Sequence, residues 1–343
     1  MVFMLLCVQY LHEVSAIMAT LQEVARKAGV TVTTVSRMLN KPDVVSPATV
    51  KKIKQAMREL DYHPNELARS LSKKTSNFIG LIVPSARNAF FAKVIERMER
   101  HITANGYKLL LCVSNHERRK ELEYFSMLKA NKVAGVIIAS HTQDIAESVS
   151  FDAPILSIDR VISPRISAVC SDNLSGGRMA AELLIAKGCK RIAYFSGGAM
   201  LHGMSASLRQ QGFEQALRER GMTPIIQAHR EDRFISMKYE DLIAAFFETH
   251  GDIDGAVCSN DILAAEIIRF AVRRGLDVPG KLKVIGYDDI DLAELYTPSI
   301  TTVHQPVNDI SRFAVESIIQ FGKRPIPSST IFPVRLVERE STG

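Results

Sequence analysis

From Phe78 onward, short apolar runs alternate with helical stretches, and this alternation limits the possible folds more than any other feature of the chain. The runs have the composition of buried strands, and Ala89–Ala104 and Arg118–Ala130 have apolar residues at helical spacing. The expected strands are Phe78–Val83, Lys108–Val113, Val133–Ala139, Ile155–Ile158 and Ile166–Cys170. Strand, helix and strand in succession form a parallel pair, so we expect a doubly wound parallel sheet.

The same pattern restarts after Ser171-Asp172-Asn173. Helices are expected at Gly177–Lys187, Ser207–Arg220, Ser236–Thr249 and Ile262–Arg274, and strands at Arg191–Phe195, Pro224–Ala228, Gly255–Cys258 and Leu282–Gly286. A last helix, Val307–Phe321, and the run Thr330–Val337 complete the sheets. We therefore expect an α/β core at 77–340 with two lobes, the N-lobe at about 77–173 and 306–322 and the C-lobe at about 174–305 and 323–340. A ligand is expected between them, beyond the carboxyl ends of the strands.

The stretch Thr20–Asn40 contains two short helical periods on either side of Gly29, where a tight turn is expected. Thr31 stands at an N-cap position and fixes the start of the second helix. A third helix begins at Ser46-Pro47, and its apolar stripe covers the first two. The pattern predicts an all-α helix-turn-helix head over residues 19–63.

The second helix of this head presents small polar and cationic side chains outward, as contacts with bases and phosphates require. These side chains are Thr33, Thr34, Ser36 and Arg37. Residues 20–76 also carry an excess of six positive charges, which equals the net charge of the whole chain, +6. Because phosphate contacts depend on such charge, the head is predicted to bind double-stranded DNA. The alternative is a solvated helical bundle with a lysine-rich face.

Residues 64–76 follow the head as a hinge segment and linker. Asn65–Leu71 is long enough for only two helical turns, too few to be stable alone in water, so this segment is expected to fold when it docks. Residues 1–18 begin with an apolar run that lacks the basic region of a signal peptide and is too short to span a bilayer. A membrane anchor is one interpretation, and we prefer an upstream extension with no membrane contact.

The chain shows none of the motifs of the common enzyme classes. The five cysteines are scattered, with no metal spacing or disulfide framework, which fits a reducing cytoplasm. Gly176-Gly177 and Gly197-Gly198 are interpreted as isolated pairs in turns. We expect no enzyme activity, no cofactor and no metal, and a cytoplasmic, nucleoid-associated protein. An enzyme with a dispersed Ser/His/Asp triad and a secreted sugar-binding protein are the alternatives from other classes.

An ordered set of motifs resembles the lactose/galactose repressor family of bacterial transcription regulators from about Thr20 to about Glu338. The set comprises Leu21–Asn40, Tyr62-x-Pro-Asn-x-x-Ala-Arg-x-Leu71, Asn260-Asp261, Val284-Ile-Gly-Tyr-Asp-Asp289 and Thr301-Thr-x-x-Gln305. The resemblance implies a hinge helix between the head and a clamshell core similar to periplasmic sugar-binding proteins. It also implies a homodimer on a pseudo-palindromic operator. Tetramers of this family use a leucine repeat near the C-terminus, and the sequence shows no such repeat, so a dimer is expected. Several stretches are most similar to repressors of sucrose and ribose operons.

Carried over position by position, the resemblance makes Val32, Thr33 and Arg37 the candidates for base contacts, with Val32 limited to a thymine methyl group or a gap. Thr31, Thr34, Ser36 and Asn65 complete the DNA-contact candidates. Leu71 matches the leucine that paired hinge helices insert into the minor groove at the operator centre. Plain core packing is the alternative for that leucine.

The resemblance also places a set of polar and aromatic residues around the ligand. They are Asn88, Phe90, Phe91, Asp159, Arg160, Arg209, Phe234, Asn260, Asp288 and Gln305. Phenylalanine rings can stack on the C–H face of a sugar, while carboxylates accept and arginines donate hydrogen bonds at its hydroxyl rim. A small neutral sugar, of the sucrose/fructose type or ribose, is therefore the expected effector. A purine corepressor is the alternative.

Release of the operator by sugar is the expected mechanism, because a change in the angle between the lobes can melt the hinge helices. The sign of the response stays open at this point, since the same architecture also serves corepressors.

Overall fold

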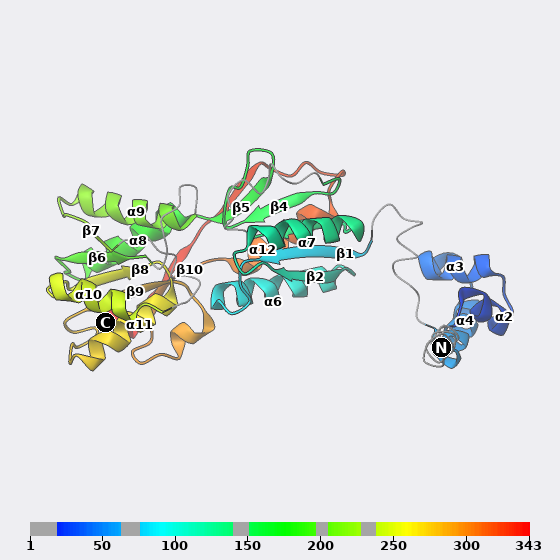
Figure 1. Ribbon diagram of the computed structural model, residues 1–343, viewed down its shortest axis with the longest axis horizontal. Coiled ribbons are helices and arrows are strands. Elements are labelled where there is room, and N and C mark those ends of the chain that lie inside the picture. The colour runs from blue at the N-terminus through cyan, green and yellow to red at the C-terminus, as the bar shows by residue number, and fades with distance from the viewer. Residues whose placement is uncertain (1–18, 63–75, 140–150, 197–204, 228–237) are drawn as a thin grey trace, which may run out of the picture. The chain divides into compact units, whose positions relative to one another are not determined.

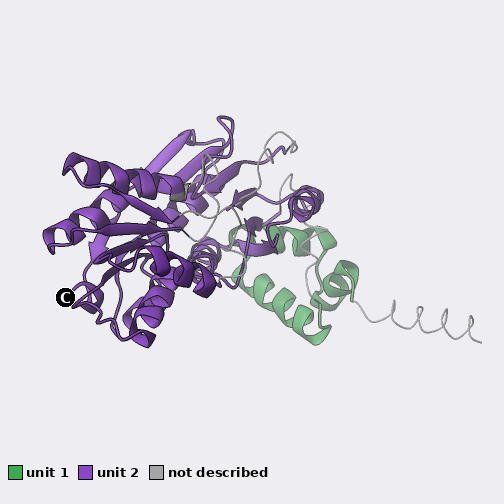
Figure 2. Ribbon diagram, turned by 60° about the vertical axis from the view of Figure 1, so that its left-hand side comes forward, with its two compact units in different colours: residues 1–74 green, residues 75–343 purple. Residues whose placement is uncertain are grey.

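The computed structural model describes residues 19–62, 76–139, 151–196, 205–227 and 238–343 (Figure 1). The chain divides into two compact units, Met1–Lys74 and Thr75–Gly343, which Figure 2 colours separately. The hinge segment expected at 64–76 falls almost entirely outside the described residues. Among the described helices, none is both long and apolar enough to cross a membrane.

The first unit contains helices α2 (Leu21–Ala28), α3 (Val32–Asn40) and α4 (Pro47–Glu59), with a short 3-10 turn, η1 (Pro42–Val44). Gly29 ends α2 in the left-handed conformation, at φ 66°, which a residue without Cβ adopts at little cost. The Thr31 hydroxyl then caps α3 by accepting from the Thr34 amide at 3.2 Å. The core is made by the side chains of Val24, Ala25, Val35, Met38, Ile53 and Ala56. The expected helix-turn-helix with a covering third helix is confirmed.

The first lobe of the second unit is built on a six-stranded parallel sheet in the order β11-β5-β4-β3-β1-β2. Its strands are β1 (Phe78–Val83), β2 (Lys108–Val113), β3 (Gly135–Ile138), β4 (Ile155–Ile158), β5 (Ser167–Ser171) and β11 (Ser329–Phe332). Helices α6 (Ala89–Ala104) and α12 (Val307–Ile319) share one hydrophobic core with the sheet, and α7 (Arg118–Ala130) belongs to another. The lobe is therefore a three-layer α/β structure.

The second lobe has a six-stranded sheet in the order β12-β10-β9-β8-β6-β7, parallel except for the pairing of β12 with β10. Its strands are β6 (Ile192–Phe195), β7 (Ile225–Gln227), β8 (Gly255–Cys258), β9 (Lys283–Asp288), β10 (Thr301–His304) and β12 (Arg335–Val337). In Figure 1, α8 (Asn173–Ala186) and α9 (Ser205–Glu219) lie above this sheet, while α10 (Glu240–Thr249) and α11 (Asp261–Arg273) lie below it. Short 3-10 turns follow at η3 (Asp291–Glu294) and η4 (Glu340–Thr342). The expected fold class, a helical head followed by two doubly wound lobes, is confirmed.

Two details differ from expectation. Residues 323–340 were expected in the second lobe, but β11 pairs in parallel with β5 of the first sheet, and only β12 joins the second. Gly176-Gly177 lies inside α8 and not in a turn, because Asp172 caps that helix four residues earlier than Gly176 and accepts from the Ser175 amide at 3.0 Å. Gly197-Gly198 lies outside the described residues.

Candidate functional site

Two of the predicted ligand residues, Asn88 and Asn260, each cap a helix at the carboxyl end of a strand. The Asn88 carbonyl oxygen accepts from the amides of Phe90 and Phe91 at 3.0 and 3.3 Å, at the start of α6. The Asn260 carbonyl oxygen accepts from the Leu263 amide at 2.9 Å, at the start of α11. The Asn88 carbonyl oxygen thus accepts two bonds and leaves the amide nitrogen for a ligand, whereas the Asn260 carbonyl oxygen can still accept a second bond.

The neighbouring phenylalanines separate in the structure. Phe91 is 1% exposed and packs in the core of the first lobe, whereas Phe90 lines a small cavity bounded by first-lobe residues and by Gln305 at a crossing between the lobes. The two rings touch edge to face, with centroids 5.3 Å apart. Phe90 is therefore the aromatic ring positioned to contact a ligand, and Phe91 stabilises the helix behind it.

A closed ring of buried polar contacts runs along the cleft. The Ser171 hydroxyl donates to Gln305 at 2.7 Å, and the Gln305 amide donates to an Asp288 carboxylate oxygen at 2.7 Å. Arg209 lies 3.5 Å from that same oxygen and donates from Nε to the Asn173 carbonyl oxygen at 2.6 Å. The Asn173 amide donates to the Ser171 backbone carbonyl at 2.9 Å, which closes the ring. The ring thus links Ser171 of the first lobe, through Gln305, to the charged pair of Arg209 and Asp288 in the second lobe.

Arg209 is the centre of charge in this ring. Its guanidinium lies 3.8 Å above the Tyr287 ring, and Nη1 donates to the Ser259 carbonyl at 2.7 Å. A buried guanidinium with these partners has a fixed orientation, because its five donors form a rigid fork. Arg209 is thereby aimed at the carboxyl group of Asp288 and attracts that of Asp159 in the first lobe.

The two predicted acceptors both titrate abnormally. Burial raises the pKa of Asp288 to about 7, and the nearby charge of Asp159 adds to this, while Arg209 and the Gln305 hydrogen bond act in the opposite direction. Burial also raises the pKa of Asp159, against the attraction of Arg209. The carboxyl groups of Asp159 and Asp288, from opposite lobes, are therefore both attracted by the single positive charge of Arg209. Both are suited to accept hydrogen bonds from hydroxyl groups.

Asp159 and Arg160 follow β4 but point to different surroundings. Asp159 lines the cavity, from a backbone at φ 62° that is uncommon for a non-glycine residue. Arg160 is buried, and its backbone carbonyl accepts from the Ser157 hydroxyl at 2.6 Å. The cavity lining does not include Arg160 among the residues that the structure describes.

The lining of the cavity combines polar and apolar side chains. It is lined by Phe90, Val94, Ile158, Asp159, Ser171, Gln305, Val307 and Ile310. Between these residues there is room for about one water molecule. A larger ligand therefore requires the side chains around the cavity to rearrange.

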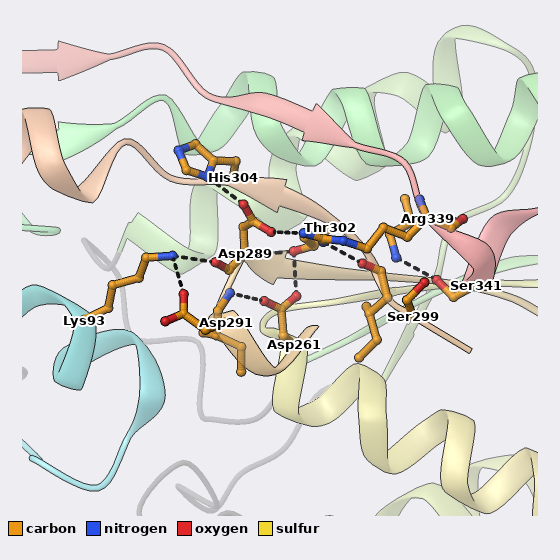
Figure 3. Close-up of polar contacts among 12 residues, drawn as sticks. Lys93, Asp261, Asp289, Asp291, Ser299, Thr302, His304, Arg339 and Ser341 are labelled. Atoms are coloured by element: carbon orange, nitrogen blue, oxygen red, sulfur yellow. Dashed lines mark hydrogen bonds and ion pairs between the residues drawn. The ribbon is translucent and has the colours of Figure 1, made fainter. Parts of the chain in front are cut away.

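The turn after Asp288 has a strained backbone, and several hydrogen bonds hold it in place (Figure 3). Asp288 and Asp289 have φ values of 104° and 51°, a region that non-glycine residues seldom adopt. The Asp289 amide donates to the Thr302 hydroxyl at 3.3 Å, and the buried Asp261 carboxylate accepts from Thr302 at 2.5 Å and from the Ile290 amide at 2.9 Å. These bonds fix the turn in the conformation that directs Asp288 into the cleft.

The Asp289 carboxylate is anchored by two side chains. His304 contacts one of its oxygens at 2.7 Å, and Arg339 donates to the other at 2.8 Å. Although burial raises its pKa, these hydrogen bonds and the charges of both partners lower the pKa of Asp289 to about 2. Asp289 is thus ionised throughout the physiological range and serves as an anchor for the turn.

In the first unit, helix α3 exposes most of the predicted DNA contacts. Thr31, Thr33 and Arg37 are exposed, and Val32 is 40% exposed although it is apolar. Thr34 and Ser36 are half-buried, and Thr34 hydrogen-bonds to the Thr31 hydroxyl at 2.9 Å. An exposed valine on a short helix that also presents an arginine is suited to contact with a thymine methyl group.

Three predicted residues, Asn65, Leu71 and Phe234, lie outside the described residues. In the opposite sense, the prediction did not include Ser171 and Asn173, which the structure places in the ring beside Gln305. Both belong to the Ser171-Asp172-Asn173 segment where the strand-helix pattern restarts. Their position at a crossing between lobes was the signal that could have identified them.

Comparison with protein families matches residues 20–65 to bacterial regulatory proteins of the lacI family and residues 181–342 to a periplasmic binding protein-like domain. The sucrose operon repressor of Lactococcus lactis subsp. lactis is 36% identical over 304 residues, covering 88% of this chain and 93% of that protein. The ribose operon repressor of Halalkalibacterium halodurans is 35% identical over 327 residues, covering 95% and 97%. The HTH-type transcriptional repressor PurR of Vibrio atlanticus is 32% identical over 336 residues, covering 94% and 98%.

Solved structures agree with this result. The lac repressor dimer bound to operator and the anti-inducer ONPF matches with a TM-score of 0.83 at 25% identity, covering 95% of this chain and 99% of that chain. A periplasmic binding protein/LacI transcriptional regulator from Alkaliphilus metalliredigens complexed with D-xylulofuranose matches with a TM-score of 0.70 at 30% identity, covering 78% and 99%. On this evidence, the chain belongs to the lacI family of bacterial regulatory proteins, which are DNA-binding transcriptional repressors and not enzymes.

Proposed function

We propose that this chain represses a sugar-utilisation operon in the cytoplasm. It acts as a homodimer whose two heads bind a pseudo-palindromic operator, and a small uncharged sugar between the lobes releases it. The names of the relatives that repress sucrose and ribose operons support the choice of a sugar of the sucrose/fructose type or ribose.

The observation that carries this proposal is the ring around Arg209 and Asp288, with Phe90 beside it. A sugar has hydroxyl groups that both donate and accept, and this site offers carboxylates, an amide and a guanidinium in one place. The C–H face of the sugar would lie on the Phe90 ring. Because the site contains two carboxyl groups and Arg209, an uncharged ligand fits its charge better than an anion.

The proposed coupling follows from the crossings between the lobes. Ser171, Asn173 and Gln305 lie at two of these crossings and hydrogen-bond to each other or to the charged pair. A sugar that contacts both lobes would favour one angle between them, and a shift toward that angle would alter the spacing of the two heads on DNA. To release the operator, the sugar must favour the releasing conformer by ~1.4 kcal/mol for each tenfold change in the population ratio.

Thermal unfolding of the full-length chain with ribose, fructose, sucrose, their phosphates and purines tests the ligand class. A ligand at 100 times its Kd should add ~2.7 kcal/mol to the free energy of unfolding. A Phe90→Ala variant should lose most of the response, whereas Phe321→Ala, at a ring 54% exposed on the surface, should keep it. A full response from Phe90→Ala would place the sugar elsewhere.

Operator binding is tested on helix α3. Arg37→Ala should cost about 1–3 kcal/mol on the preferred operator and relax the sequence preference, because a base-edge contact is lost. Arg58→Ala removes the same charge from the exposed face of α4 and should weaken binding to all sequences by a smaller and uniform factor. An unchanged preference in Arg37→Ala would show that another residue reads the bases.

A purine-responsive regulator is the second candidate, and the 32% identity to PurR favours it. A purine would also stack on Phe90. The thermal panel separates the two, since only one ligand class should raise the unfolding temperature.

A further inference from the structure

A lysine of the first lobe reaches across to the second lobe at the edge of the cleft (Figure 3). Lys93 on α6 donates from Nζ to the backbone carbonyl of Asp289 at 2.8 Å and lies 3.3 Å from an Asp291 carboxylate oxygen. The Lys93 side chain is 16% exposed, whereas that of Asp291 is 86% exposed. The ion pair is therefore screened by solvent and weak, and the sheltered bond to the carbonyl is the stronger part of the contact.

This contact joins two elements that each carry a residue of the proposed sugar site. Phe90 lies one helical turn before Lys93 on α6, and Asp288 directly precedes Asp289 in the turn. In the part of the chain that the structure describes, Lys93 is not among the residues that line the cavity. The lysine thus lies beside the site and connects its two walls.

The acceptor is held rigidly by its own lobe. His304 and Arg339 anchor the Asp289 carboxylate, and Thr302 accepts from the Asp289 amide. Asp261 accepts from the next amide, that of Ile290. Because the turn cannot follow Lys93 without breaking these bonds, the Lys93–Asp289 distance depends on how the two lobes lie relative to each other.

We propose that Lys93 is a positioning residue that couples the closure of the lobes to effector affinity. This proposal rests on the proposed function, because it concerns the same cleft. The Lys93 contact exists only when α6 and the turn are within reach, and a sugar between Phe90 and Asp288 requires the same arrangement. The lysine and the sugar therefore stabilise one conformer, so loss of the lysine weakens every effector by the same factor.

Hydrogen exchange of the full-length protein without any ligand tests the contact directly. Lys93→Met keeps the apolar stem of the side chain and removes the ammonium group. Backbone amides of residues 286–296 should exchange faster in this variant than in the wild type, because the turn loses a partner in the other lobe. Arg100→Met is the matched control, since Arg100 lies on the same helix and pairs with Glu96 of α6 at 2.7 Å. Equal exchange in Lys93→Met and in the control would overturn the proposal.

Calorimetric titration with ribose, fructose and sucrose tests the coupling. Lys93→Met should weaken each sugar that the wild type binds by about tenfold, which corresponds to ~1.4 kcal/mol. Asp291→Asn removes only the exposed ion pair and should change affinity less than twofold. Unchanged affinity in Lys93→Met, or a factor that differs among the sugars as for a residue in direct contact, would contradict a positioning role. If the wild type binds no sugar, the proposed function fails, and hydrogen exchange still decides the role of Lys93.

Discussion

Burial raises the pKa of three carboxyl groups in the second unit, those of Asp159, Asp261 and Asp288. Each ionised carboxylate pays a desolvation cost that hydrogen bonds only partly offset. Asp261 accepts hydrogen bonds from Thr302 and Ile290, whereas Asp288 accepts one from Gln305 and forms an ion pair with Arg209 at 3.5 Å. At the residue scale, the candidate site is therefore a region of unfavourable charge that further hydrogen-bond donors would stabilise.

Asp288 should make the stability of the fold depend on pH. Its pKa is about 7 in the folded chain and near the ordinary value of 3.8 in the unfolded chain, so the folded state binds the proton more tightly between these values. The free energy of unfolding should therefore decrease as pH rises from 5 to 8. Asp288→Asn removes this dependence, so the variant should gain stability relative to the wild type over that range in urea unfolding.

Asp291→Asn is the control for this experiment, because its carboxylate is exposed. Its stability should differ from that of the wild type by the same amount at every pH. A constant difference for Asp288→Asn as well would show that Asp288 stays ionised in the folded chain.

Thr302→Val should destabilise the turn after β9. The substitution keeps the shape of the side chain but removes the donor to Asp261 and the acceptor for the Asp289 amide, and leaves buried groups unpaired. We expect a loss of about 1–3 kcal/mol in urea unfolding. Thr103→Val removes a hydroxyl that donates to Glu99 on the exposed face of α6 and should cost less than about 0.5 kcal/mol. Equal losses in both variants would show that the buried network contributes little.

At the scale of elements, helices α8 and α9 pack with their backbones in contact. A Cβ on Gly177 would lie 1.8 Å from the Arg209 carbonyl oxygen, and one on Gly212 would lie 1.9 Å from the Leu174 carbonyl oxygen. No such approach is possible for residues with a side chain. The glycines therefore determine how close α9, and Arg209 on it, lies to the rest of the lobe.

Gly177→Ala should force α9 away from α8 and displace Arg209 from Asp288. We expect a loss of about 1–3 kcal/mol in stability, as for other overpacked cores, and a loss of sugar binding beyond what that instability explains. Calorimetry and urea unfolding of the same sample measure both. Normal sugar affinity in a destabilised Gly177→Ala variant would show that Arg209 keeps its place.

The elements also show how far the sequence allows prediction. The β-α alternation, the caps and Gly29 are local signals, and they predicted the head and both lobes. Phe90 and Phe91 could not be told apart, because adjacent helical residues point about 100° apart and only the packing of α6 decides which of them faces the cleft. The run Thr330–Val337 is predicted to lie in the C-lobe, yet it is divided between two sheets around Pro333, whose nitrogen has no hydrogen to donate to a ladder. The ring of polar contacts that Asn173 closes could not be predicted either, because it depends on contacts between segments that are distant in the sequence.

At the scale of the whole molecule, the chain combines a small, positively charged unit with a much larger unit that contains the candidate ligand site. The core of the first unit consists of six buried side chains, whereas each lobe of the second has two extensive hydrophobic clusters. Because small domains bury a smaller share of their surface, the head should be the less stable unit.

The two units should therefore unfold in separate steps. Hydrogen exchange in increasing urea should open α2 to α4 first and the strands of both lobes later. A bound sugar should raise the urea concentration needed for the second step and leave the first unchanged. A single step that shifts as a whole with sugar would show that the units are coupled even without DNA.

The division of β11 and β12 between the two sheets has a consequence for synthesis on the ribosome. Neither sheet has all its strands until residues 329–337 have emerged, although the head has all its residues some 270 positions earlier. Since nascent domains generally fold in order from the amino terminus, the DNA-binding head can fold while both sheets of the second unit still have exposed edges. A frameshift or premature stop before codon 329 would thus release a folded head attached to two lobes that each lack a strand, and such a product would have lost its response to metabolites.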